Sequence, residues 1–323
     1  MTMEFRTEIS VGRSPFTVAH DRCGFAAGSC FAEQMAARLE ALRFPLTASP
    51  TGILFNPASM AAMIRRLAGG QPYAVDELFE SGGLWHSYDH HGSFSRPTAR
   101  ETLRAVNAAF RNGAEGLRRA DYVMLTFGTA WIYRLVEDGR IVANCHKQPA
   151  DRFVRERLRT EAIVAEYDAL LAGPLAGKQV LLTVSPVRHL KDGLVENSLS
   201  KAILRCAAAD LAERWPNVWY FPAYELLNDD LRDYRFYAPD MTHPSPQAID
   251  YVWERFVRFA MDDATAALLP RLERLRTALG HRMLHAGSEG EAMFRRRSLA
   301  LIDELQRALP QLDFSAERHH FGA

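Results

Sequence analysis

Short apolar runs alternate with helical stretches along most of this chain, and this alternation constrains its fold more than any other feature. Residues 121–127, 179–184 and 218–221 are compact apolar runs typical of strands buried on both faces, 22–27 is another, and a weaker run lies at 44–47. Such alternation predicts right-handed crossovers and a mostly parallel sheet covered by helices on both faces. The chain is therefore expected to be an α/β protein.

The remaining periodicity predicts the helices and the domain boundary. Apolar residues recur at helical spacing after residue 30, and helices are expected at 58–67, 101–109, 160–171, 199–214 and 246–260. Residues 131–136 and 140–145 flank an Asp-Gly step that predicts a hairpin, whereas 76–95 reads as an irregular loop. Only helical patterns follow residue 262. We therefore expect an α/β domain over 1–263 and a helical C-terminal extension over 264–323.

Composition and charge narrow the classes of function. The chain has 323 residues, with 39 basic and 39 acidic side chains, so no overall field favours nucleic acid or an anionic membrane as a partner. Its four cysteines are scattered, and no ligand spacing typical of zinc is present, so we expect reduced thiols, no metal and no cofactor. The N-terminus lacks a signal-peptide pattern, and no apolar run approaches the ~20 residues of a membrane span. A cytoplasmic location is expected.

Ser29 lies where the first expected strand meets the first helix. The run 23–27 ends at Gly28, and the apolar stripe of Phe31, Met35 and Leu39 begins directly afterwards. In open α/β sheets ligands bind at such junctions, and a helix N-terminus favours an anion there. Serine is also a preferred N-cap residue, so on local sequence alone a structural cap is the simpler interpretation of Ser29.

Other polar residues follow other expected strands. Gly128 and Thr129 follow 121–127, residues 185–189 follow 179–184, and Asp240 with His243 stands in a loop before the helix at 246–260. The carboxyl ends of parallel strands share one edge, so these segments are expected to converge on Ser29. The Asp-x-x-His spacing lets a carboxylate bind one imidazole nitrogen and leave the other free, as a general base requires.

Several motifs resemble those of one protein family. Residues 28–32 spell Gly-Ser-Cys-Phe-Ala, the motif for which the GSCFA family is named, and further segments are similar to that family at 85–87, 128–131, 143–147, 185–193, 221–225 and 240–245. The resemblance covers roughly residues 5–260. The family in turn is similar to the SGNH hydrolases, so the resemblance implies a flavodoxin-like, three-layer α/β/α fold and a Ser-His-Asp set that attacks esters.

The resemblance also implies roles for individual residues. Ser29 matches the nucleophile of the SGNH hydrolases, and Asp240 and His243 match their Asp-x-x-His block. Gly52 is loosely placed as the glycine whose N–H binds the oxyanion. The third SGNH block, Gly-x-Asn, reads Gly128-Thr129-Ala130 here, so the asparagine donor is absent. The side chains considered as its replacement are Asn56, Thr129, His86 and Asn144.

From these matches the chain is expected to be a serine esterase or acyl hydrolase that forms an acyl-enzyme on Ser29, with an acetylated carbohydrate or another small ester as substrate. An acyltransferase using the same residues and a non-catalytic binding module, suggested by the absent asparagine, are the alternatives. Arg188 and His189 follow a strand at the functional edge and are candidates for binding a substrate anion, or for a structural ion pair. Cys30 is expected to pack rather than react. A homo-oligomer formed through the C-terminal helices is left open.

Overall fold

A five-stranded parallel sheet forms the centre of the computed structural model, which describes residues 6–281 and 288–322. The strand order is β10-β9-β5-β1-β2, and every neighbouring pair is parallel. The strands are β1 (Gly24–Gly28), β2 (Leu46–Ala48), β5 (Tyr122–Phe127), β9 (Gln179–Val184) and β10 (Val218–Tyr220). All five strand runs expected from the sequence are therefore confirmed, including the weak one near residue 46.

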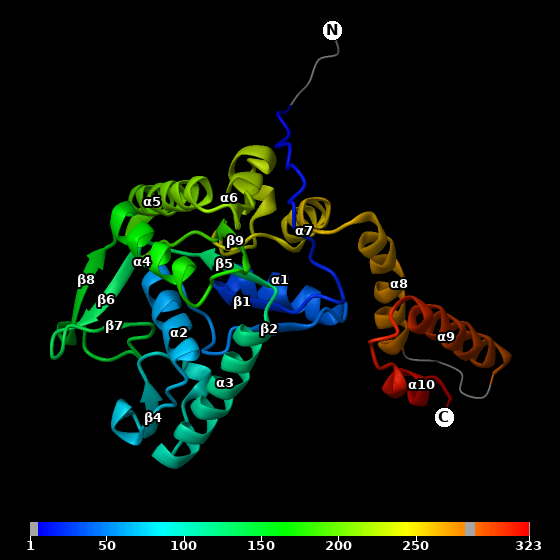
Figure 1. The fold of residues 1–323 in the computed structure, drawn as a ribbon, viewed down its shortest axis with the longest axis horizontal. Helices are drawn as coiled ribbons and strands as arrows, with labels where there is room; N and C mark the ends of the chain where they lie inside the picture. The colour runs from blue at the N-terminus through cyan, green and yellow to red at the C-terminus, as the bar shows by residue number, and fades with distance from the viewer. Residues whose placement is uncertain (1–5, 282–287, 323) are drawn as a thin grey trace, which may run out of the picture.

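Helices cover both faces of this sheet (Figure 1). The helices are α1 (Cys30–Ala41), α2 (Pro57–Gly69), α3 (Ala99–Arg119), α4 (Thr160–Ala172), α5 (Gly193–Arg214), α6 (Ala223–Glu225), which continues into a π-helical turn (Leu226–Leu231), and α7 (Pro246–Ala260). Successive side chains along β9 point to opposite faces of the sheet. Leu182 therefore joins an apolar cluster with α2, α3, α4 and α5, whereas Leu181 joins a second cluster with α1 and α7. The α/β class with a mostly parallel sheet is confirmed.

Two small antiparallel sheets extend the connections of the main sheet. β6 (Trp131–Leu135) and β7 (Ile141–Val142) form the predicted hairpin, and β8 (Phe153–Arg157), which was not predicted, pairs with the other side of β6. The prediction of an irregular loop over 76–95 is wrong in part. β3 (Leu78–Ser81) and β4 (Leu84–Ser87) pair as a hairpin there, because the Gly82-Gly83 step between them forms a tight turn.

The C-terminal helices are α8 (Asp263–Leu279), α9 (Glu289–Ala308) and α10 (Ser315–Gly322). Figure 1 shows them gathered on the side of edge strand β2. Ile302 and Phe314 belong to the same buried cluster as Leu39 of α1, so these helices share a core with the α/β part. An ion pair from Arg43 to Glu317 also joins them. The described residues of 264–323 thus form helices joined by short non-helical segments, and they pack against the end of α1.

No helix within residues 6–281 and 288–322 combines the length and the apolar character needed to cross a bilayer. The first five residues, on which the prediction of no signal peptide largely rests, lie outside the described residues.

Strand order also locates a crevice. Numbered by their order in the chain, the five strands lie in the order 2-1-3-4-5 across the sheet. The chain runs from β1 outward to β2 on one side, and later from β5 to β9 and β10 on the other side. The direction of the connections therefore reverses between β1 and β5. Ligands of open parallel sheets bind beside the carboxyl ends of the strands at such a reversal point. Ser29 follows β1 and Gly128 follows β5, so both lie at this point.

Candidate functional site

The turn that carries Ser29 depends on glycine. Gly28, the last residue of β1, has φ of +151°, and a Cβ there would lie 2.5 Å from the carbonyl oxygen of Thr126 on β5. Only glycine fits this approach without displacing the backbone of the neighbouring strand. Ser29 follows at the N-cap position of α1 and is 1% exposed. The Gly-Ser pair therefore fixes the serine directly at the carboxyl end of the central strands.

The side chain of Ser29 does not cap the helix that it precedes. Its Oγ is buried and has no hydrogen-bond partner among the described residues. At other N-cap positions of the molecule the side chain does accept an N–H: Asn56 from Ser59, Ser245 from Ala248 and Asp262 from Thr265. A buried hydroxyl without a partner is unfavourable by roughly 1–3 kcal/mol, so the structural role that the local sequence favours does not account for Ser29.

Three chain segments meet around Ser29. A Cβ on Gly128 would lie 3.4 Å from the Cβ of Ser29, so the two residues are in contact, and only 2.8 Å from the carbonyl oxygen of Phe55, an approach that leaves no room for a side chain. The N–H groups of Gly128 and Thr129 both donate to the carbonyl of Phe55, each at 2.8 Å. Leu54 in turn donates to the carbonyl of Gly28 at 2.9 Å. The segment 54–56 therefore lies across the ends of β1 and β5, beside Ser29.

Asn56 ends this crossing segment, and only the oxygen of its side-chain amide makes a hydrogen bond. Its Oδ1 accepts the N–H of Ser59 at 2.8 Å, and the residue is 6% exposed. No hydrogen bond joins its Nδ2 to another described residue. The two N–H donors of Asn56 are therefore free, on a segment whose backbone is bonded to both sides of Ser29.

Asp240 and His243 form a pair in the loop before α7. The Nδ1 of His243 lies 2.6 Å from Oδ2 of Asp240, as the Asp-x-x-His spacing predicts, and Oδ1 accepts the N–H groups of Thr242 (2.9 Å) and His243 (3.0 Å). These hydrogen bonds, led by the backbone N–H of His243, lower the pKa of Asp240 to about 2. The carboxylate stays ionised at neutral pH, and Nε2 of His243 remains available for proton transfer.

The loop that holds this pair is fixed from the end of β9. The N–H of Arg188 donates to the carbonyl of Thr242 at 3.1 Å, and its guanidinium lies 3.9 Å from the ring centre of Tyr237. Arg188 also donates to the carbonyl of Met241 at 3.4 Å. Arg188 thus contacts the loop that carries Asp240 and His243, a contact that its position in the sequence did not indicate.

The structure brings the predicted residues together in two groups rather than one. Ser29, Asn56 and Gly128 form the first group, and Asp240, His243 and Arg188 form the second. Ser29 Oγ makes no hydrogen bond within the described chain, so it is not bonded to His243. The imidazole is 41% exposed and the carboxylate 50% exposed, so the second group lies at the surface while Ser29 is buried.

Comparison with family models identifies the chain at this point. The model of the GSCFA family matches residues 25–256, and that of the GSCFA domain protein, C-terminal domain, matches residues 272–323. The chain belongs to the GSCFA family. A search of curated proteins found no match.

In this GSCFA protein Gly52, the glycine expected to bind the oxyanion, uses its N–H for a hydrogen bond within its own loop. The N–H of Gly52 donates to the carbonyl of Ser49 at 2.8 Å and closes a turn. A Cβ on Gly52 would lie 2.4 Å from Cβ of His91, so the residue faces the segment after β4. Gly52 shapes the loop that leads to Asn56, and its N–H is used within that loop.

The other candidates for the missing asparagine make hydrogen bonds within their own segments or with α5. His86 binds Ser95 through Nδ1 (2.7 Å) and the carbonyl of Ser81 through Nε2 (3.0 Å), inside the β3–β4 segment. The amide oxygen of Asn144 accepts the N–H of His146 at 2.8 Å. Thr129 Oγ1 lies 3.2 Å from Oγ of Ser200 and accepts the N–H of Trp131. The Nδ2 of Asn144 has no partner among the described residues either, but Asn144 lies against Tyr88, whereas the segment that ends at Asn56 lies against Gly28 and Gly128 on either side of Ser29.

His189 and Cys30 have local structural partners. The N–H of His189 donates to Oδ1 of Asn197, its Nε2 lies 3.8 Å from Asp192, and burial lowers its pKa. The lowered pKa favours the neutral imidazole, so these contacts hold His189 in place without an ion pair, and Arg188 pairs with no carboxylate among the described residues. Cys30 is partly buried, and burial raises the pKa of its thiol, which disfavours the reactive thiolate.

One buried charge near the site was not predicted. Lys201 of α5 is 1% exposed, and its Nζ donates to the carbonyls of Gly128 (2.6 Å) and Ser185 (2.7 Å). Burial lowers its pKa to about 7, and the nearby Cys30 raises it. The signal was present in the sequence, because Lys201 shares a helical stripe with Leu204 and Leu211, which marks the core face of α5.

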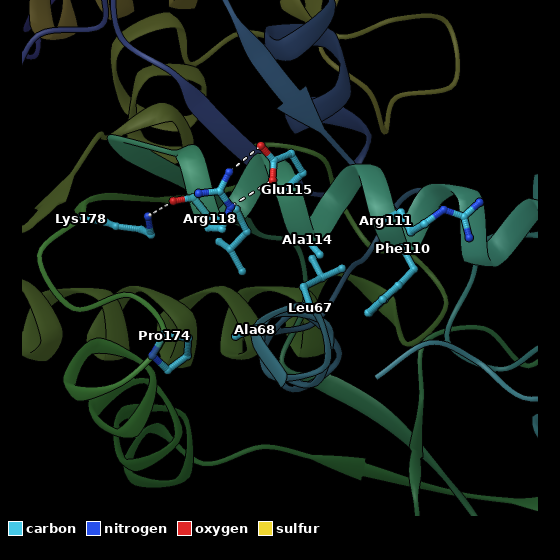
Figure 2. Close-up of a pocket in the computed structure, with 10 residues that line it drawn as sticks. Leu67, Ala68, Phe110, Arg111, Ala114, Glu115, Arg118, Pro174 and Lys178 are labelled. Carbon is cyan, nitrogen blue, oxygen red and sulfur yellow. Dashed lines mark hydrogen bonds and ion pairs between the residues drawn. The ribbon is translucent and has the colours of Figure 1, made fainter. Parts of the chain in front are cut away.

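The described part of the GSCFA protein shows no second candidate site. Within the described residues no group of three or more His, Cys, Asp or Glu side chains could hold a metal ion. A groove of about 540 Å³ lies between α2, α3 and the loop before β9 (Figure 2), at the amino ends of β5 and β9, whereas Ser29 follows the carboxyl end of β1. Its floor residues Leu67 and Phe110 are only 5% and 7% exposed, so it offers little apolar surface to a ligand.

Proposed function

We propose that this GSCFA protein is a serine hydrolase of esters that works through an acyl-enzyme on Ser29. The observation that carries the proposal is the buried Ser29 hydroxyl, which lies at the reversal point of the sheet and has neither a cap bond nor another partner. Its place at the reversal point distinguishes Ser29 from Ser59, whose Oγ is also buried without a partner, and a nucleophile needs an Oγ that no structural bond occupies. The strand order 2-1-3-4-5 is that of flavodoxin-like sheets and supports the relationship to SGNH hydrolases.

In the proposed reaction His243 is the general base. Its Nε2 takes the proton of Ser29 as Oγ forms a bond to the ester carbonyl carbon, and Asp240 stabilises the imidazolium through Nδ1. The alcohol then leaves as its C–O bond breaks and takes the proton from His243. Water attacks the acyl-enzyme with the same base, and the acid is released as Ser29 recovers its proton. Because Ser29 is buried and not bonded to His243, substrate binding must draw the exposed loop 240–243 toward the serine.

The oxyanion in this scheme is bound by Asn56 and by the start of α1. The Nδ2 of Asn56 has two free donors, and the first N–H groups of α1 have no partner within the helix. Asn56 would replace the asparagine that the third SGNH block lacks at Ala130. One such donor is worth roughly 10²–10³ in rate.

A panel of short acyl esters, including acetylated carbohydrates, tests the proposal with Ser29→Ala and His243→Ala. We expect both variants to lose turnover. Ser59→Ala is the matched control, because Ser59 also has a buried Oγ without a partner, and it should retain turnover. If Ser29→Ala and His243→Ala hydrolyse the esters as fast as the parent, the proposal is wrong. Product analysis with and without sugar acceptors then distinguishes hydrolysis from acyl transfer to a hydroxyl.

A non-catalytic binding module is the second candidate. It is favoured by one observation, namely that Ser29 and His243 belong to separate groups with no hydrogen bond between them. A fluorophosphonate probe separates the two candidates, because a binding module has no activated serine. Labelling of Ser29 supports the hydrolase, and its absence in a folded protein supports the binding module.

A further inference from the structure

Lys201 connects the ends of two central strands through a single buried ammonium group. Its Nζ donates to the carbonyl of Gly128, directly after β5, and to that of Ser185, directly after β9. These carbonyls lie beyond the last paired residues of the β5–β9 ladder, which are Phe127 and Val184. Lys201 therefore supplies donors at the point where the sheet stops holding its two neighbouring strands together.

Each of the two carbonyls belongs to a different half of the site. Gly128 lies against Ser29, and its N–H is already held by Phe55. Ser185 begins the short segment in which Arg188 donates its N–H to Thr242, next to His243. The ammonium of Lys201 thus bonds directly to Gly128, which lies beside Ser29. It also bonds to Ser185, from which a short segment leads to the loop of His243.

The choice of lysine for this position is unfavourable for folding alone. Burial of an ammonium carries a large desolvation penalty, and an apolar residue of similar size would pack on this face of α5 without it. Two carbonyl oxygens at 2.6 and 2.7 Å offset part of the penalty. A buried lysine that spans the site is therefore better explained by what it holds in place than by its contribution to stability.

We propose that Lys201 is a positioning residue that fixes the Ser29 half of the site relative to the His243 half by binding the carbonyls of Gly128 and Ser185 together. This inference rests on the proposed function, because it assigns a role in assembling that active site. Lys201 touches no reacting atom in this scheme and acts through the two segments that it joins. The approach of His243 to Ser29 then starts from a fixed separation of the β5 and β9 ends.

Lys201→Met tests the proposal, with Ser200→Ala as the matched control. Methionine keeps an unbranched apolar stem that is one heavy atom shorter and removes the donors. Ser200 precedes Lys201 on the helix and holds only the first loop, through the N–H of Ala130 (2.8 Å) and Oγ1 of Thr129. Hydrogen exchange of the whole protein, read by mass spectrometry, should rise at both 127–131 and 185–189 in Lys201→Met, but only at 127–131 in Ser200→Ala.

Kinetics with a short ester provide the second readout. Misplacement of the two halves by about 1 Å should lower kcat by roughly 10- to 100-fold, while KM stays within about twofold because no group that binds the ester is removed. Ser200→Ala should keep kcat within about threefold of the parent. A general loss of folding would instead lower the active fraction and leave the kcat of the folded molecules unchanged.

The results separate this proposal from the proposed function. Unchanged hydrogen exchange at 185–189 in Lys201→Met overturns the positioning role, whether or not the parent turns over esters. Raised exchange at both segments together with an unchanged kcat also overturns it. Failure of the proposed function appears differently, as a parent protein without turnover or labelling of Ser29. If Lys201→Met does not fold, Lys201→Gln keeps N–H donors on a shorter side chain, and the same rise in exchange at both segments is expected.

Discussion

Replacement of Ser29 by alanine should remove activity without lowering stability. The change removes a buried Oγ that has no hydrogen-bond partner and makes no cap bond. Relief of its desolvation penalty is worth about 1–3 kcal/mol, and the small void left by one oxygen offsets about 1 kcal/mol of this gain. With an unfolding entropy of about 2.1 cal/mol/K per residue over 323 residues, each kcal/mol corresponds to a Tm shift of about 1.5 °C. We therefore expect a Tm rise between 0 and about 3 °C, together with a loss of kcat/KM of at least about 10⁴-fold.

Calorimetry and ester turnover measure the two effects, and two serines provide controls. Ser288→Ala removes an Oγ that accepts the N–H of Glu291 at 3.2 Å at the start of α9, so its Tm should fall by about 1.5 °C. Ser59→Ala should match Ser29→Ala in Tm and keep its activity. A Ser29→Ala protein that is destabilised as much as Ser288→Ala, or that keeps its turnover, would show that Ser29 is a structural residue and would refute the reasoning.

Three further variants test the surrounding groups. Asn56→Asp keeps the oxygen that caps α2 but removes the Nδ2 donors, so Tm should change by less than about 1 °C while kcat falls roughly 10²-fold; an unchanged kcat in the ester assay contradicts the oxyanion role. Asp240→Asn should lower kcat by about 10³–10⁴-fold with little change in KM. The pKa of Asp240 is about 2, which is below its value in the unfolded chain, so its contribution to stability is present above pH 4 and is lost as pH falls toward 2. The Tm difference between the parent and Asp240→Asn should therefore shrink over that range. A Tm difference that does not depend on pH argues against the Asp240–His243 pair. Arg188→Leu removes the guanidinium that lies over Tyr237 and should raise hydrogen exchange at 240–243 and lower kcat, whereas unchanged exchange there contradicts its contact with the loop.

The main sheet was predictable because its strands are short apolar runs whose neighbours are helices of clear periodicity. The run at 121–127 became β5, and even the weak run near residue 46 became β2. β8 was missed because residues 153–157 are two apolar side chains followed by three charged ones, without the alternation typical of a strand, and only pairing with β6 makes them a strand. The Gly82-Gly83 step was a hairpin signal for β3 and β4 that the aromatic composition of 76–95 obscured.

The candidate site divides in the same way between local and long-range information. The Asp240–His243 bond follows from a spacing of three residues, so the sequence predicts it directly. The engagement of Gly52 in a turn and the free amide of Asn56 depend on how loop 49–56 folds over β1 and β5, which no local pattern encodes. Lys201 stands about 70 residues from Gly128, and only the crossover that places α5 against β5 and β9 brings them together.

The central claim is that Ser29 forms a covalent acyl-enzyme, and the most direct test is the mass of the protein during turnover. The intact protein is mixed with a slowly hydrolysed ester, quenched in acid and digested. We predict an increment equal to the acyl group on the peptide that contains Ser29, reduced in His243→Ala and absent in Ser29→Ala. Turnover of the ester with no acyl increment on Ser29, or with the acyl group on Cys30 instead, would contradict the account.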